Sequence, residues 1–143
     1  MDHQSVALVI RWLHVAAMAT ILGGAVLLSW LAVRGARTTI VEVAVRYEQL
    51  FWAALGIIVM TGVGNLGAFG LALPAPATNW GGTFIVKITA VVLLVALSLP
   101  RSLVVARMAG GADAHATTIR WLYGGTAGAV AVIAALAVWL AHG

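Results

Sequence analysis

The stretch IRWLHVAAMATILGG, residues 10–24, decides the fold, because it opens a long apolar run that carries an arginine and a histidine near its head. Residues 15–33, 49–73 and 121–141 contain no charged side chain, and 81–100 contains only Lys87. A transmembrane helix needs about 20 consecutive apolar residues, so all four stretches are long enough to span a bilayer. The pattern predicts an all-α fold: an integral membrane, antiparallel four-helix bundle with four transmembrane helices.

The composition supports the membrane assignment. Of the 143 residues, 63% are hydrophobic and 8% are charged, whereas soluble domains average about 45–50% and about 25%. The lipid bilayer is therefore the expected partner, and the arrangement of the +4 net charge does not indicate nucleic acid. The absence of cysteine excludes disulfides, thiolate metal sites, iron–sulfur clusters and haem attached through the chain's own thiols.

Glycine, proline and small polar residues divide the chain into its helices. We expect helices at about 5–34, 40–70, 82–108 and 117–141 within a single transmembrane domain, 1–143, separated by GARTT, a proline-containing loop and AGGADA. Pro100 should bend or loosen the end of the third helix. The first run is too long for a cleavable signal peptide and more runs follow it, so residue 1 is expected to begin the mature chain.

The arginines predict the orientation of the bundle. They cluster after the first span and around the connection between the third and fourth, at Arg34, Arg37, Arg46, Arg101, Arg107 and Arg120, while residues 71–82 carry no charge. By the positive-inside rule the arginine-bearing connections are cytoplasmic. Both termini are then expected to be periplasmic in a bacterial inner (cytoplasmic) membrane.

Small residues on the helices predict close packing. Gly124 and Gly128 form a GxxxG motif, which we expect to serve packing within the bundle, with a dimer interface as the alternative. Gly23 and Gly24 would thin the wall of the bundle close to the opening stretch.

The polar side chains converge on the outer half of the bundle. Arg11, His14 and Met18 lie within about 60° of one direction on a helix, and His3 falls near the same line. Lys87 and His142 come to the same half from the third and fourth helices. Long side chains such as those of Arg11 and Lys87 can reach the headgroups by themselves. His14 cannot, and an ionisable residue inside the membrane is by default a functional hypothesis, although a structural hydrogen bond is the alternative.

Three kinds of role are open to a histidine that faces the interior of a bundle. His14 could be an axial ligand of haem iron, with His142 or His3 as a second ligand. With Met18 one turn away it could instead bind copper, in a copper-binding or transport protein. The third reading is a cofactor-free accessory subunit of a larger membrane complex, in which His14 makes a hydrogen bond.

Two segments resemble a known family. RWLHVAAMATILGGAVLL, residues 11–28, is similar to the first helix of the CopD-like membrane domain, and WGGTFIVKITAVVLLVALSLPR, residues 80–101, is similar to the helix of that family with a single lysine. The related HemJ-type protoporphyrinogen oxidases share the four-helix size, and their functional histidine and lysine match His14 and Lys87 in helix number and depth. The resemblance implies a CopD-like/HemJ-like four-helix membrane protein with haem b.

These observations lead to one expected function. We expect a small integral membrane haem b-binding redox (electron-transfer) protein, a component of a membrane oxidoreductase, with its site in the outer half of the bundle. His14 is the expected axial ligand, while Arg11 and Lys87 would contact haem propionates or a quinone oxygen. The expected partners are a quinone or a redox protein at the outer face, and a homo-oligomer or larger membrane complex. No catalytic residue is assigned.

Overall fold

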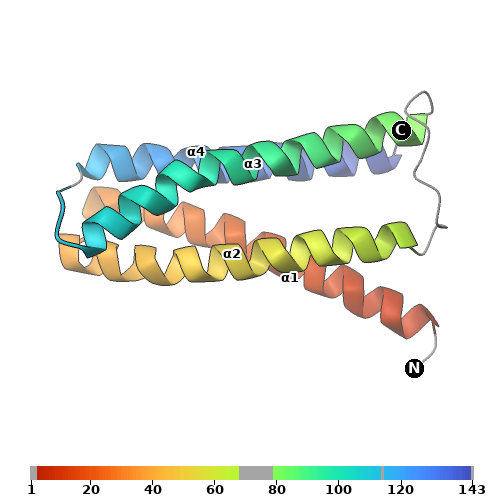
Figure 1. Cartoon of the computed structure of the whole chain (residues 1–143), viewed down its shortest axis with the longest axis horizontal. Coiled ribbons are helices and arrows are strands. Elements are labelled where there is room, and N and C mark those ends of the chain that lie inside the picture. Colours follow the sequence, from red (N-terminus) through yellow and green to blue (C-terminus); the bar gives the residue numbers. More distant parts are fainter. Residues whose placement is uncertain (1–2, 68–78, 114, 143) are drawn as a thin grey trace.

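Four long helices make up the protein (Figure 1). The computed structural model describes residues 3–67, 79–113 and 115–142, without the side chains of 3, 63–67, 79–80, 83–84, 87 and 139–142. In these ranges lie α1 (His3–Arg34), α2 (Arg37–Gly67), α3 (Asn79–Ala109) and α4 (Ala116–His142). Each contains a segment of 22 to 31 residues that is apolar enough to cross a membrane. The predicted all-α membrane bundle is confirmed.

The predicted helices agree with the observed ones apart from their ends. The largest differences, of three residues each, are at the starts of α2 and α3: α2 begins at Arg37 instead of residue 40, and α3 begins at Asn79 instead of residue 82. Gly35 and Ala36 alone separate α1 from α2. The Gly35 N–H donates to the Leu31 carbonyl at 2.6 Å, and the Ala36 carbonyl already accepts the Ile40 N–H at 3.1 Å. Residues 68–70, expected at the end of the second helix, lie outside the described residues.

A glycine cap ends α3. Gly111 has a φ of 94°, a left-handed conformation that glycine adopts without steric cost. Its N–H donates to the Met108 carbonyl and the Ala112 N–H donates to the Arg107 carbonyl, both at 3.0 Å, which is the Schellman pattern. Arg37 then joins the two short connections, through an ion pair with Asp113 and a 2.8 Å hydrogen bond to the Ala112 carbonyl.

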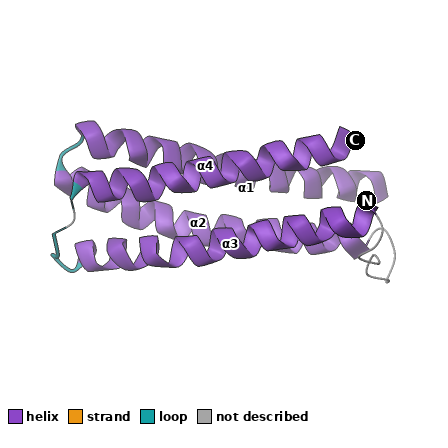
Figure 2. Cartoon of the chain, turned by 90° about the horizontal axis from the view of Figure 1, so that it is seen from above, coloured by secondary structure: helices purple, strands orange, loops and turns teal. Residues whose placement is uncertain are grey.

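The two ends of the bundle differ (Figures 1 and 2). We call the end that holds residues 35–36 and 110–115 the short-loop end, and the opposite end the termini end. Consecutive helices run antiparallel, and each packs against its two neighbours: α1 and α3 both contact α2 and α4.

Among the described side chains, most of the buried apolar ones lie in the half of the bundle nearest the short-loop end. The buried series on α1 starts at Ala17 and continues through Ile21, Ala25, Leu28 and Ala32. On α3 it starts at Leu94, after a stretch from residue 85 to 93 whose described side chains are exposed or half-buried, and on α4 the last buried side chain in the described part is Val130. Beyond this level the first turns of α1 diverge from the other helices (Figure 1).

Glycines allow close helix contacts at some of the predicted positions. A Cβ built on Gly24 would overlap the Tyr47 ring, whose hydroxyl donates to the Ile21 carbonyl at 2.9 Å, so this glycine makes room for α2 against α1. Gly124 also faces α1, with Ser29 Oγ 3.8 Å from the position of its absent Cβ. Gly128 has nothing within 4 Å, so the packing expected of the GxxxG motif applies to Gly124 alone.

Candidate functional site

His14 lies on the interior face of α1. It precedes the buried residues Ala17, Ile21 and Ala25 at the three- and four-residue spacing of one helix face, and its side chain is half-buried. Its Nδ1 lies 2.9 Å from Oγ1 of Thr61, a buried residue of α2. The histidine therefore joins α1 to α2 at the level where the apolar core ends, and faces inward as the sequence predicted.

The geometry at Thr61 favours one tautomer of His14. Thr61 Oγ1 lies 2.7 Å from the Ile57 carbonyl and 3.1 Å from the Ile58 carbonyl, and neither oxygen can donate a proton. With the hydroxyl hydrogen of Thr61 directed at those carbonyls, Oγ1 is left to accept a hydrogen bond from His14 Nδ1. This contact favours the neutral tautomer that carries its lone pair on Nε2, the form in which a histidine binds a metal ion through that nitrogen.

Arg11 and Met18 lie on either side of His14 along α1. Arg11 is exposed, one turn toward the termini end. Met18, one turn deeper, packs against the hydrophobic core. Core packing accounts for Met18 without a metal.

The other predicted ligands fall outside the described side chains. Lys87, His3 and His142 are in α3, α1 and α4, but only their backbones are described. The backbone register still fixes the level of Lys87. Thr61 lies 13 residues from Glu48 and Ile88 lies 13 residues from Arg101, and Glu48 contacts Arg101, so residue 88 is level with Thr61. Lys87 thus belongs to the same level of the bundle as His14.

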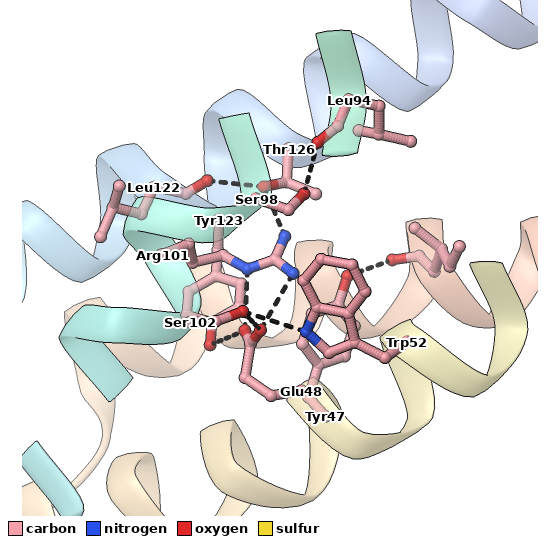
Figure 3. Close-up of polar contacts among 11 residues, drawn as sticks. Tyr47, Glu48, Trp52, Leu94, Ser98, Arg101, Ser102, Leu122, Tyr123 and Thr126 are labelled. Atoms are coloured by element: carbon pink, nitrogen blue, oxygen red, sulfur yellow. Dashed lines mark hydrogen bonds and ion pairs between the residues drawn. The ribbon is translucent and has the colours of Figure 1, made fainter. Parts of the chain in front are cut away.

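A second polar cluster lies in the core, nearer the short-loop end (Figure 3). Glu48 of α2 accepts hydrogen bonds from Arg101 Nε at 2.8 Å and Arg101 Nη2 at 3.2 Å. It also accepts bonds from Ser102 Oγ at 2.5 Å and from the Tyr123 hydroxyl at 2.9 Å. Arg101 Nη1 donates to Thr126 Oγ1 at 2.8 Å. The carboxylate and the guanidinium are thus both well satisfied, and together they tie α2, α3 and α4.

Aromatic rings enclose this ion pair. The Arg101 guanidinium carbon lies 4.1 Å from the centroid of Phe51 and 5.3 Å from those of Tyr47 and Tyr123. Cation–π attraction therefore adds to the ion pair in a site without solvent contact, since Arg101 is 0% exposed. Four donors on Glu48 and a guanidinium held by Glu48 and Thr126 make the cluster a rigid connection between α2, α3 and α4.

The prediction that Arg101 flanks a cytoplasmic connection is wrong. Leu94, Ser98, Arg101 and Val105 follow one another at the spacing of one helix face, which is the buried face of α3. The next arginine along α3, Arg107, is exposed. Glu48 lies beside Tyr47 and Phe51 on the buried face of α2 in the same way. The spacing of Arg101 and Glu48 along apolar helix faces could have predicted this ion pair from the sequence, because a charge on a buried face needs a buried partner.

The described residues constrain the metal hypotheses. Within them, no group of three or more histidine and acidic side chains is placed to hold a metal ion. One neutral imidazole with an oriented ring fits an axial haem ligand, because haem iron takes a single protein nitrogen on one side and such a histidine usually donates its other N–H to a fixed acceptor. The prediction of copper stays untested at His3 and His142.

Comparisons with known proteins found no match: no family model, no curated protein and no solved structure matched the chain. The resemblance to the CopD-like and HemJ-like proteins therefore remains a prediction from the short segments that carry it.

Proposed function

We propose that the protein is a small haem b-binding redox protein of the membrane, of the CopD-like/HemJ-like type, with His14 as an axial ligand. The observation that supports this best is the 2.9 Å contact between His14 Nδ1 and Thr61 Oγ1, which orients the ring and favours the tautomer with the lone pair on Nε2. A ring held in this tautomer and in this direction is the arrangement that metal-binding histidines commonly have.

The residues around His14 define what the chain would contribute to a bound haem. Among the described side chains, the buried apolar series starts one turn below His14, at Ala17 of α1. A bound haem would supply one-electron redox chemistry. The chain itself would hold the ring of His14 through Thr61 and exclude water on the core side, while Arg11 would compensate the charge of a propionate.

The site lies toward the termini end, which on this proposal faces the periplasm of a bacterial inner membrane. A quinone or a redox protein would exchange electrons there. A second copy or a larger membrane complex completes the proposed set of partners, and the exposed Arg11 and Trp12 at this end would contact them.

The absorbance spectrum tests the proposal. Protein purified from cells supplied with haem should show a Soret band and, after reduction, α and β bands. His14→Ala should lose them, because the neighbouring inward-facing side chains on α1, Ile10 and Ala17, cannot bind iron. His115→Ala is the matched control, since His115 is exposed in the connection before α4 and should keep a normal spectrum.

Two outcomes would reject haem and select between the alternatives. A colourless protein with nearly one copper per chain by elemental analysis would favour the copper-binding function. A colourless protein without metal, which co-purifies with a larger assembly and whose activity survives His14→Ala, would favour the accessory subunit. In that case the bond between His14 and Thr61 is structural.

A further inference from the structure

Three arginines at the short-loop end have no acidic partner. In the described part of the chain each acidic side chain forms an ion pair with one arginine: Glu42 with Arg46, Glu48 with Arg101 and Asp113 with Arg37. Arg34, Arg107 and Arg120 are exposed and form no ion pair with any of these carboxylates. Their charges are therefore available to an anion from outside the described chain.

Arg34 and Arg120 lie at one level on two helices that contact each other, α1 and α4. Ser29 Oγ lies 3.8 Å from the position of the absent Cβ of Gly124, which fixes the register of these antiparallel helices. Arg34 is five residues from Ser29 toward the short-loop end. Arg120 is four residues from Gly124 in the same direction, on the side of α4 that faces α1. Their backbones therefore differ in level by about 1.5 Å, the rise of one residue.

Two exposed tryptophans flank this pair of arginines. Trp30 is 52% exposed and Trp121 is 76% exposed, and the same register places them within about 3 Å of one level. The Arg34 guanidinium carbon lies 5.5 Å from the centroid of the Trp30 ring. The first apolar span ends at Arg34 and the fourth begins at Ala116. Because tryptophans concentrate at the boundary between hydrocarbon and headgroups, this level of α1 and α4 lies at the headgroups of one leaflet.

We propose that the short-loop end of the interface between α1 and α4 binds one anionic phospholipid, whose phosphate is shared by Arg34 and Arg120. Packed helices lie about 8–10 Å apart, a span that two arginine side chains can bridge through one phosphate. Two like charges repel each other, and an anion between them removes that repulsion. A guanidinium also binds phosphate through two parallel N–H···O bonds.

The surroundings favour a phospholipid over a soluble anion. On the same side of α4, toward the termini end, Gly128 has open space where a Cβ would be and Val132 is exposed, so an acyl chain can lie against the helix there. A soluble anion would gain nothing from this apolar surface or from the tryptophans. A zwitterionic lipid would bring an ammonium group to a place where the described carboxylates are already paired. The site does not depend on bound haem.

Titration with short-chain lipids tests the site. Native mass spectrometry of the full chain in detergent should show one molecule of dioctanoyl phosphatidylglycerol bound before any other, and dioctanoyl phosphatidylcholine bound at least about tenfold more weakly. Arg34→Gln and Arg120→Gln should each lower the affinity for phosphatidylglycerol about tenfold, the usual effect of losing a charge-assisted hydrogen bond. Both arginines are exposed, so neither change should disturb the fold.

Two control variants separate this site from surface charge in general. Arg46→Gln removes an exposed arginine that is already paired on its own helix. Arg107→Gln removes an exposed arginine without an ion pair at the level of Arg120, because each lies six residues from the contact between Arg101 and Thr126. Arg107 belongs to α3, which does not contact α1 in the described part of the chain. Both controls should bind phosphatidylglycerol as the parent does.

Three results would overturn the proposal. Equal losses of affinity in all four variants would show a diffuse attraction to surface charge. Equal affinity for phosphatidylcholine, or displacement of phosphatidylglycerol by inorganic phosphate at the same concentration, would reject an anionic lipid as the occupant. A stable dimer of the lipid-free protein that excludes phosphatidylglycerol would assign this face to a second copy of the chain.

Discussion

At the scale of single residues, the ion pair of Glu48 and Arg101 determines how the helices fit together. Burying two charges costs several kcal/mol of desolvation for each ion, and this cost is recovered here through four donors on the carboxylate and three aromatic rings around the guanidinium. Replacing either residue alone would therefore leave its partner as an unpaired buried charge. The value of the pair lies in the specific register that it imposes on α2, α3 and α4.

Single substitutions of this pair should be severely destabilising. Arg101→Met leaves the Glu48 carboxylate buried without its cation, and we expect a loss of about 3–5 kcal/mol in the free energy of unfolding in detergent micelles, followed by circular dichroism. Arg46→Met is the matched control. Arg46 is exposed and pairs with Glu42 across one helical turn, so its loss should stay within about 0.5 kcal/mol.

A double substitution tests whether Glu48 and Arg101 act as a pair. Glu48→Leu combined with Arg101→Met removes both charges, so the loss should be smaller than the sum of the two single losses. Additive losses would show that the two side chains act independently, and the account of the pair would be wrong.

Residues in single helices were predictable to different extents. The interior orientation of His14 follows from its spacing to the apolar face of its own helix, and the structure agrees. Its partner Thr61 and the pairing of Glu48 with Arg101 depend on the register between helices far apart in sequence. Periodicity marks which residues face inward, but it does not state which of them meet.

At the scale of the helices, the contact between α1 and α2 depends on a glycine that the sequence assigned to another purpose. Gly24 was expected to thin the wall beside a cofactor, whereas the space next to it holds the Tyr47 ring. The neighbouring Gly23 has nothing within 4 Å of its absent Cβ. Two adjacent glycines of the same helix therefore have different roles, which a sequence pattern cannot separate.

This difference can be measured with matched substitutions. Gly24→Ala should lower the free energy of unfolding by about 1–3 kcal/mol, because the added methyl group displaces the Tyr47 ring and weakens its bond to the Ile21 carbonyl. Gly23→Ala adds the same methyl group to the same helix in open space and should be neutral or slightly stabilising. Equal effects of the two changes on thermal unfolding in micelles would argue against the contact.

The helices themselves were the most predictable feature of the fold, because their signal is local. Charge-free runs of about 20 residues set their number and length. The end of α3 followed from the glycines of AGGADA, while the start of α2 was missed by three residues because Arg37 and the two threonines resemble a loop in composition. Their place in the helix depends on the tight turn at Gly35 and Ala36, and on the contact of Arg37 with Asp113.

At the scale of the whole molecule, the charge distribution still predicts an orientation after Arg101 is removed from it. Arg101 is buried and neutralised by Glu48, so it contributes nothing at the membrane surface. The remaining arginines near the short-loop end are Arg34, Arg37, Arg46, Arg107 and Arg120, against Arg11 toward the termini end. The short-loop end therefore still carries more arginines than the termini end, and the positive-inside rule still predicts that it is cytoplasmic.

Reporter fusions test this orientation. An alkaline phosphatase fused to the C-terminus should be active, as in the periplasm, and one inserted in 109–114 should be inactive, as in the cytoplasm. Because Arg101 is buried and is not part of the charge at the membrane surface, Arg101→Met should leave this pattern unchanged. It should do so even if it lowers the amount of folded protein. Replacement of Arg34, Arg37 and Arg107 by asparagine should instead give a mixed orientation, since it removes three of the five surface arginines at that end. Reversed activities in the parent chain would place His14 toward the cytoplasm, and the redox partner would then have to be sought on that side.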